Sequence, residues 1–349
     1  MSKQTENLLI PLFNYLDNTL EPDPLLVTVQ LEMLQLSGVP SRRLWQYFFS
    51  DPCRRLFMLS IIAPMSVTRT RKHNAQELFR LWENGVFDRE QELEVFSALA
   101  VLNHGPILPV LADIVFHGDP GDYWRQRCAS LGLLHLDCRD LQDDIERTLR
   151  KCLRQERFPE FWPVLLSKLV GRGLRQRWMK LFFEHGEKCS CDNNAGLLEA
   201  FSLCRQDGLP YFQRALFNPH WNCGGNATSR AVAYRGLKRL EVKLSQLWTD
   251  IEIQPAAARA NALNLLLHCL SLSAHDLTPL EPAALLYERY FSNHFLIGQV
   301  EEEQRDWAWT VRDQLEIAMR GEALRTLAQQ PPRPPVESVG SERPEPAED

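Results

Sequence analysis

Residues 107–134 read ILPVLADIVFHGDPGDYWRQRCASLGLL. The apolar run 107–116 predicts a short helix that ends at the turn 117–120, where glycine and proline both oppose helix continuation. Apolar residues then recur at helical spacing: Trp124, Cys128, Leu131 and Leu134. Because residues three or four apart share one face of a helix, the stretch predicts a helix–turn–helix unit.

The rest of the chain carries the same kind of signal. The clearest apolar stripe lies in 229–248, with Thr228 or Ser229 as the N-cap. Five further helices are predicted at 75–84, 89–103, 141–153, 163–184 and 256–272. The sequence has no long alternation of apolar and polar residues rich in Val, Ile and Thr, which would predict strands. It therefore predicts an all-α protein.

Breaks between the predicted helices recur along the chain. Turn-forming residues stand at 51–52, 84–85, 119–120, 157–159, 185–186 and 218–219. Successive breaks lie roughly 30 to 40 residues apart, which is the length of one helix–turn–helix unit. A period of that size is typical of a solenoid built from stacked helix pairs.

Two of these units resemble HEAT repeats. The first covers 107–136 and turns at Asp119-Pro120, and the second covers 211–240 and turns at Asn218-Pro219. In both, an apolar helix precedes the turn, and the second helix carries arginine ahead of small residues. The resemblance implies a right-handed α-solenoid of HEAT-like helix pairs, in which the small residues let paired helices approach closely.

We expect the chain to divide into three segments. Residues 1–275 are predicted to form the HEAT-like repeat domain, and 276–330 a C-terminal helical cap with a long amphipathic helix at 300–327. Residues 331–349 begin with PPRPP and end in an acidic stretch. Such a composition cannot bury a core, so this tail is predicted to be disordered.

Composition limits the functional classes. The formal net charge of -6 argues against nucleic-acid binding driven by bulk charge. The longest apolar run, 56–65, is shorter than the roughly 20 residues of a transmembrane helix, and residues 1–7 do not resemble the start of a signal peptide. The nine scattered cysteines predict free thiols rather than a disulfide framework. A cytoplasmic protein without a membrane segment is expected.

Two basic patches are candidate sites for a partner or an anion. One is 42–72, and the stretch 42–80 that contains it has eight basic and two acidic residues. The other is 168–180, which has five basic residues and no acidic one. The candidate residues are Arg42, Arg43, Arg54, Arg55, Lys168, Arg172 and Arg175. The last three would share one helix face, and arginine suits phosphate or carboxylate. Solvated faces, or pairing with acids such as Glu83, Glu90, Glu92 and Glu94, are the more common explanation of such patches. Whether the two patches share a surface stays open.

Four residues have the donor atoms of a zinc site: Cys189, Cys191, His220 and Cys223. Thiolate and imidazole ligands suit tetrahedral zinc. Their spacing departs from the Cys-x-x-Cys pattern of typical sites, and cysteines in loops beside a histidine are commonly incidental. We therefore assign no metal, and binding by these four residues stays open.

Motifs of the common hydrolase and nucleotide-binding families are absent from the sequence, including the nucleophile elbow, the zinc-protease helix and the P-loop. The sequence favours a non-enzymatic scaffold or adaptor, without a cofactor, that binds a protein partner on the concave face of its repeats. An exposed tryptophan would be a candidate contact. The alternative is a nucleic-acid-binding or DNA-repair protein similar to HEAT-like DNA glycosylases, using both patches and the aromatic residues Trp162, Trp178 and Phe182. The partner's identity and the oligomeric state stay open.

Overall fold

The protein is helical throughout the part that the structure covers. The structure, a computed structural model, describes residues 3–18, 27, 30, 41–66, 68–119, 121–221, 227–252, 254–276 and 278–329. Every regular element in these ranges is an α-helix or a 3-10 helix, and no described residue forms a strand. The all-α prediction is confirmed. Two compact units are present: Met1–Val242 with Gln254–Ala262, and Lys243–Ile253 with Leu263–Asp349.

The helix–turn–helix unit predicted at 107–134 is confirmed. It consists of η2 (Gly105–Ile107), α7 (Leu108–His117) and α8 (Tyr123–Leu133). A Cβ atom at Gly132 would lie 2.9 Å from Cδ1 of Leu111. Glycine at this position therefore lets α8 pack closely against α7, as the small residues of the second helix led us to expect.

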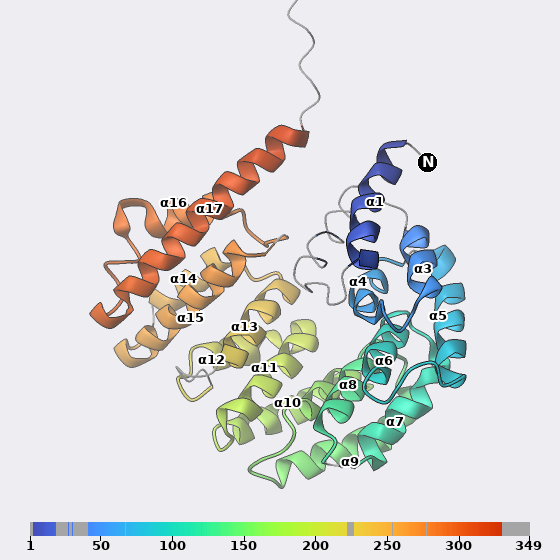
Figure 1. Ribbon diagram of the computed structural model, residues 1–349. Helices are drawn as coiled ribbons and strands as arrows, with labels where there is room; N and C mark the ends of the chain where they lie inside the picture. Colours follow the sequence, from blue (N-terminus) through green and yellow to red (C-terminus); the bar gives the residue numbers. More distant parts are fainter. Residues whose placement is uncertain are drawn as a thin grey trace, which may run out of the picture. The chain divides into compact units, whose positions relative to one another are not determined.

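In the first unit, α8 belongs to a row of helices that pack side by side. This first row consists of α6 (Glu92–Val101), α8, η4 (Trp162–Lys168), α11 (Cys191–Leu203) and α13 (Ala227–Arg239). Each of these helices packs against the next, from α6 to α13 (Figure 1). Neighbouring helices of this row are separated in sequence by about the length of one predicted repeat.

A second row of helices packs against the first. It consists of α5 (Thr68–Glu83), α7, α9 (Gln142–Leu153), α10 (Arg172–Gly186) and α12 (Leu209–Leu216). α5 packs on α6, α7 on α8, α9 on η4, and both α10 and α12 on α11. Fully buried side chains fill the space between the rows, among them Phe96, Leu133, Phe182, Phe201 and Phe212. Burying each contributes roughly 1.5–3 kcal/mol.

The chain before α5 forms α1 (Lys3–Asn18), α3 (Ser41–Ser50), η1 (Leu56–Met58) and α4 (Leu59–Ile62). Phe13 of α1 stacks on Tyr47 of α3, with ring centroids 3.9 Å apart. Trp45 is buried, and its indole nitrogen donates to the Ser66 hydroxyl at 2.7 Å. α4 packs against α6 and so joins this segment to the first row.

Two predicted helices are wrong because each contains a turn. The helix predicted at 229–248 is two helices, α13 and α14 (Leu244–Glu252), and Glu241 between them has a φ of 57°. The helix predicted at 163–184 is η4 followed by α10, and Gly171 between them has a φ of 94°. A residue with positive φ cannot continue a right-handed helix. Apolar spacing continues across both turns, so periodicity did not reveal them.

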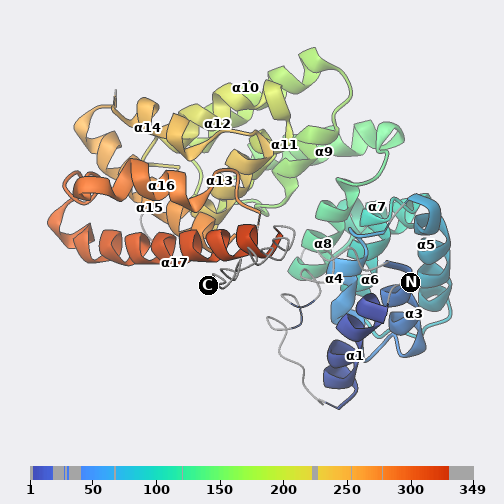
Figure 2. The ribbon, with the colours of Figure 1, turned by 90° about the horizontal axis from the view of Figure 1, so that it is seen from above.

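The second unit contains the C-terminal part of α15 (Ala256–Ala274), together with α14, α16 (Ala283–Phe291), η6 (Ser292–His294), η7 (Glu302–Gln304) and α17 (Arg305–Gln329). α16 and α17 pack side by side (Figure 2). The buried Tyr290 hydroxyl donates to the Leu244 carbonyl at 2.7 Å and joins α16 to α14. The helix predicted at 300–327 is confirmed as α17. The predicted boundary at 275/276 falls inside this unit, and the predicted tail 331–349 lies outside the described residues.

Most of the described cysteines occupy the protein interior. All eight are free thiols, and five are buried: Cys138, Cys152, Cys189, Cys204 and Cys269. Burial raises the pKa of Cys204 to about 12, so its thiol stays protonated at neutral pH. In the same ranges, no helix is long and apolar enough to cross a membrane.

Candidate functional site

The start of α8 exposes two adjacent aromatic side chains. Trp124 is 65% exposed, more than any other tryptophan of the chain, and Tyr123 is 38% exposed. Trp309 has the next highest exposed fraction, 36%. Large aromatic side chains are usually buried in a folded protein, because removing their apolar surface from water is favourable. The sequence predicted a role for exposed tryptophan without identifying which one is exposed.

The turn before α8 fixes the direction in which these side chains point. Asp119 accepts a hydrogen bond from the Gly121 backbone nitrogen through Oδ1 at 2.8 Å. The backbone carbonyl of the same residue accepts from the nitrogen of Asp122, the N-cap residue, at 3.0 Å. Aspartate favours such turns because its carboxylate can replace a backbone acceptor. The turn therefore holds the first residues of α8 in place.

Tyr123 is anchored despite its partial exposure. Its ring packs edge-on against Phe161 at 5.3 Å and against Trp124 at 5.1 Å between centroids. Its hydroxyl donates a hydrogen bond to the Glu160 carboxylate. Burial and this carboxylate together raise the pKa of Tyr123 to about 12, so the phenol remains a neutral hydrogen-bond donor at neutral pH.

A groove of about 550 Å³ lies beside Trp124. Its lining residues come from the starts of α6 and α8 and from the turns before them: Arg89, Glu90, Leu93, Asp119, Gly121, Asp122, Trp124 and Arg125. The guanidinium of Arg127, one turn along α8, lies 5.7 Å from the Trp124 ring centroid. The surface thus combines one large apolar side chain with charges of both signs.

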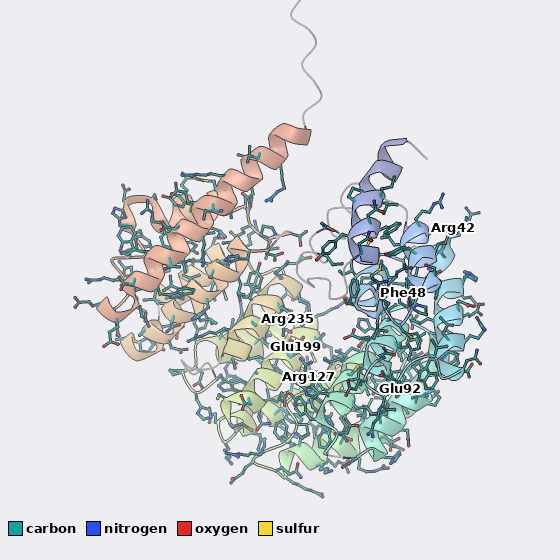
Figure 3. All side chains as sticks on the ribbon, viewed as in Figure 1. Arg42, Phe48, Glu92, Arg127, Glu199 and Arg235 are labelled. Atoms are coloured by element: carbon teal, nitrogen blue, oxygen red, sulfur yellow. The ribbon has the colours of Figure 1, made fainter. Side chains whose placement is uncertain are left out.

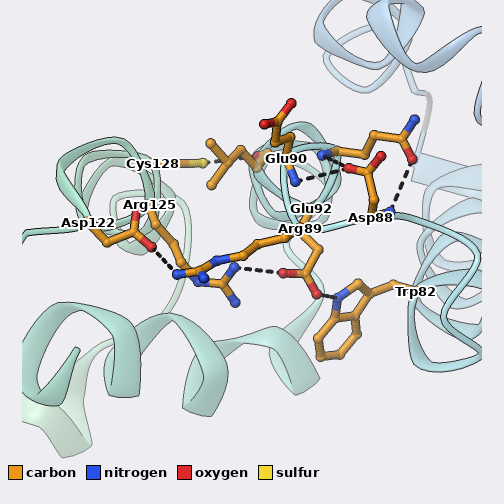
Figure 4. Close-up of polar contacts among 10 residues, drawn as sticks. Trp82, Asp88, Arg89, Glu90, Glu92, Asp122, Arg125 and Cys128 are labelled. Carbon is orange, nitrogen blue, oxygen red and sulfur yellow. Dashed lines mark hydrogen bonds and ion pairs between the residues drawn. The ribbon is translucent and has the colours of Figure 1, made fainter. Parts of the chain in front are cut away.

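Ion pairs between α6 and α8 neutralise part of the groove (Figure 4). Arg125 contacts the Glu92 carboxylate at 2.7 Å, and the Trp82 indole nitrogen donates to the other oxygen of Glu92 at 2.9 Å. Arg89 pairs with Asp122 at 2.8 Å. Glu92, which the sequence offered as a partner for the basic patches, is instead bound by Arg125 of the next helix pair. The sequence did not predict this pairing, because Arg125 lies 33 residues from Glu92.

Further hydrogen bonds join α8 to α6 and order the turn before α6. The Cys128 thiol donates to the Leu93 carbonyl at 3.0 Å. Before α6, the Asp88 carboxylate accepts from the backbone nitrogens of Glu90 and Gln91 at 3.0 and 2.9 Å (Figure 4). The first turn of α8, which carries Trp124, is therefore held by several independent contacts.

The four candidate residues of the first basic patch have different surroundings. Arg42 is exposed on α3 (Figure 3), as is Arg43, and Arg54 is exposed in the turn after this helix. Arg55 is 9% exposed, donates to the Tyr47 carbonyl at 2.5 Å, and has its guanidinium 3.5 Å from the centroid of the Tyr47 ring. Arg55 therefore packs into the fold, whereas the others face solvent.

The candidate residues of the second basic patch bind acceptors of the chain itself. Lys168 ends η4 and donates to the Leu136 carbonyl at 2.6 Å and to the Leu134 carbonyl at 3.2 Å. Arg172 and Arg175 lie on α10 and both pair with Asp207, at 2.8 and 2.7 Å. The two arginines, Arg175 first, lower the pKa of Asp207. The three residues do not share one helix face, because the turn at Gly171 separates Lys168 from the arginines.

A similar arrangement joins α11 and α13. Glu199 of α11 pairs with Arg239 at 2.9 Å and with Arg235 at 3.5 Å, and both arginines lie on α13 (Figure 3). As between α6 and α8, an acid on one helix of the first row pairs with arginine on the next. These ion pairs connect neighbouring helices of the first row.

The possible zinc ligands are only partly within the described residues, because Cys223 lies outside them. Burial raises the pKa of Cys189 to about 11, and its thiol donates to the His185 carbonyl at 3.4 Å. Among the residues that the structure describes, no group of three His, Cys, Asp or Glu side chains could hold a metal ion.

Comparison of the chain with protein-family models, curated proteins and solved structures found no match to any of them.

Proposed function

We propose that the protein is a non-enzymatic scaffold or adaptor that binds a protein partner through Tyr123, Trp124 and Arg127 on α8. The exposed Trp124 carries the proposal. Tryptophan, tyrosine and arginine are the residue types that most often dominate the energy of protein interfaces. A partner that covers Trp124 would remove its apolar surface from water, which favours association.

The rigid base of the aromatic pair supports the same proposal. Tyr123 is held by Phe161 and Glu160, and α8 is held against α6 by the ion pair between Arg125 and Glu92. Binding therefore costs less conformational entropy at Tyr123 and at the backbone of α8, since both are already held in place.

The groove beside Trp124 indicates what kind of partner fits. Arg89 and Glu90 both line the groove, so its surface is neither uniformly basic nor uniformly acidic. A protein segment that presents one apolar side chain to Trp124 and charges of both signs to the groove matches it best. A polyanion would meet the carboxylates of Glu90, Asp119 and Asp122.

We further propose that the helix pairs form a right-handed α-solenoid of the HEAT type, with the first row on its concave face. Contacts between neighbouring units recur at similar sequence separations, as expected for a repeated unit. The separations are 33 for Arg125 and Glu92, 35 for Asn193 and the Phe158 carbonyl, 38 for Ser229 and the Cys191 carbonyl, and 37 for Arg239 and Ser202.

Nucleic-acid binding has less support. Of the seven candidate bases, Lys168, Arg172 and Arg175 are occupied by acceptors of the chain, and Arg55 is largely buried. Affinity for nucleic acid depends on the number of phosphates that free cations neutralise, so this loss weakens the alternative. The proposal includes a cytoplasmic location, which the free thiols of the described cysteines support.

The proposal is tested by replacing Trp124. Tagged wild-type protein and the variants Trp124→Ala and Leu285→Ala are used to recover partners from the native host, with quantitative mass spectrometry. Leu285 is a matched control, because it is 56% exposed and lies on α16 of the second unit. We expect one protein to bind the wild type and the control equally and to fall at least about tenfold with Trp124→Ala.

Circular dichroism and thermal melting establish that both variants are folded. Equal recovery of the same partner by Trp124→Ala and by the wild type would show that the partner does not bind at Trp124. Recovery of nucleic acid alone would contradict the scaffold proposal itself.

A further inference from the structure

A second cavity, of about 510 Å³, lies between the start of α5 and the turn that follows α6. α5 contributes residues at helical spacing on one face: Thr68, Arg71, Lys72, Ala75 and Gln76. The turn contributes Leu102, Asn103, His104, Gly105 and Pro106. A volume of this size is within the range of small-molecule sites.

The turn after α6 has a defined backbone that directs His104 toward α5. Asn103 has a φ of 54°, which ends α6, and the His104 nitrogen donates to the Leu99 carbonyl at 3.0 Å. The His104 ring then packs on Phe79 of α5, with centroids 4.8 Å apart. Asparagine tolerates the left-handed conformation that this turn requires.

The cavity lining is cationic and contains no carboxylate. Arg71 and Lys72 line it, and neither forms an ion pair with any residue that the structure describes. Two further polar atoms have no hydrogen-bond partner there, Nε of Arg71 and Nε2 of His104. Buried polar atoms are normally hydrogen-bonded, so the unpaired Arg71 Nε–H and the His104 ring nitrogen, which donates or accepts according to its tautomer, point to a ligand with hydrogen-bonding atoms.

Bases of both basic patches act on a histidine outside the lining. Burial, Lys168 and Arg71 together lower the pKa of the nearby His135. One base from each of the two basic patches thus acts on the same imidazole. The patches are brought together here in part, through Arg71 and Lys168, although not through the residues that the sequence put forward as partners.

We propose that this cavity binds a small phosphate-bearing ligand of about the size of a diphosphate, with Arg71 and Lys72 as the charged contacts. The planar guanidinium of Arg71 can donate two parallel hydrogen bonds to one phosphate, and the Lys72 ammonium adds a mobile charge. His104 and the Thr68 hydroxyl supply further hydrogen-bonding groups. The site is independent of the surface around Trp124, so either can fail without the other.

A small ligand fits these residues better than a nucleic-acid backbone. Nucleic-acid binding strengthens with each phosphate neutralised and needs an extended series of free cations. The cavity provides two, and the bases at 168–175 are already bound within the fold. One ligand with two adjacent phosphates matches that number of charges.

Calorimetric titration with inorganic pyrophosphate tests the proposal. The variants are Arg71→Gln and Lys72→Gln, and the matched control is Arg69→Gln, which removes the same charge from the same helix outside the cavity. We expect saturable binding to the wild type, a Kd raised at least about tenfold by each cavity variant, and a change of less than about twofold for the control. Lys72 is exposed, so its variant remains informative if Arg71→Gln does not fold.

Three results would overturn the proposal. The first is no saturable binding of pyrophosphate to folded wild-type protein. The second is an equal loss in Arg69→Gln, which would indicate attraction by general charge. The third is tight binding of a short DNA duplex that pyrophosphate fails to displace and that weakens steeply with salt, which would instead indicate a nucleic-acid surface.

Discussion

Single side chains at the start of α8 differ in how firmly they are held. Tyr123 has two ring neighbours and a hydrogen bond to Glu160, whereas Trp124 is largely in water. The same contrast separates the predicted arginines, because Arg175 is bound to Asp207 while Arg42 faces solvent. Sequence identifies a residue's chemistry, but its availability depends on partners that are distant in the chain.

The titration of Tyr123 is predicted at this scale. Difference absorbance between the wild type and Tyr123→Phe should give a pKa of about 12, above the ordinary value of about 10. Glu160→Gln should lower this pKa only part of the way, because burial, the largest single cause of the raised pKa, remains in the variant. Glu156→Gln, an exposed neighbour with the same change of charge, should leave it unaffected.

The raised pKa also sets the sign of a stability effect. Because the folded protein holds the phenol proton more tightly than the unfolded chain, the contribution of Tyr123 is complete below about pH 10 and is lost as pH rises toward 12. Tyr123→Phe should lack this decline. A Tyr123 that titrates near its ordinary value would contradict the hydrogen bond to Glu160.

Some helices of the first row approach their neighbours closely because a glycine lacks a side chain. A Cβ atom at Gly196 of α11 would overlap the Glu160 carbonyl, and one at Gly236 of α13 would lie 2.5 Å from the Phe212 ring. The sequence predicted close approach at small residues, but it did not indicate which glycine meets which neighbour. That information depends on the register between helices of different units.

Replacing Gly196 with alanine should therefore destabilise the protein, although alanine is the better helix former. Urea unfolding of Gly196→Ala should show a loss of about 1–3 kcal/mol, the usual cost of overpacking. Gly173→Ala on α10 is the matched control, because no atom lies within 4 Å of its added Cβ. The control should be unchanged or more stable by up to about 1 kcal/mol. A Gly196→Ala variant as stable as its control would argue against the packing of α11 on η4.

Across the whole molecule, contacts divide the chain into two units, with α14 in the second and α13 in the first. The turn at Glu241 lies at this boundary, and the predicted continuous helix 229–248 would have crossed it. Contacts within a repeated stack are mainly between neighbours, so such proteins commonly lose protection locally rather than all at once.

Reciprocal substitutions test that division. Leu315 of α17 and Leu133 of α8 are both fully buried, and replacing either by alanine should cost about 2–5 kcal/mol. In hydrogen exchange, Leu315→Ala should increase the exchange rate of amides in α14, α16 and α17 and affect the rates in α6 and α8 much less. Leu133→Ala should have the reverse effect. Equal loss of protection in both units from either substitution would indicate one cooperative unit.

The sequence by itself determined the helical class and the approximate bounds of several helices, including α7, α8, α9 and α17. These follow from contacts between residues three or four apart and from proline, glycine and aspartate at turns, all of which are local in the chain. The apolar spacing did not predict the helix ends at Glu241 and Gly171, because the apolar pattern continues through these residues, whose positive φ ends the helix.

The tertiary structure alone decided which polar groups are free. Arg125 finds Glu92 33 residues away, and Arg172 finds Asp207 35 residues away, whereas Arg71 and Lys72 line a cavity without a carboxylate. It also decided that Trp124, rather than Trp162 or Trp178, meets solvent. Charge and aromatic character belong to the residue, but pairing and exposure depend on how separate helices pack against one another.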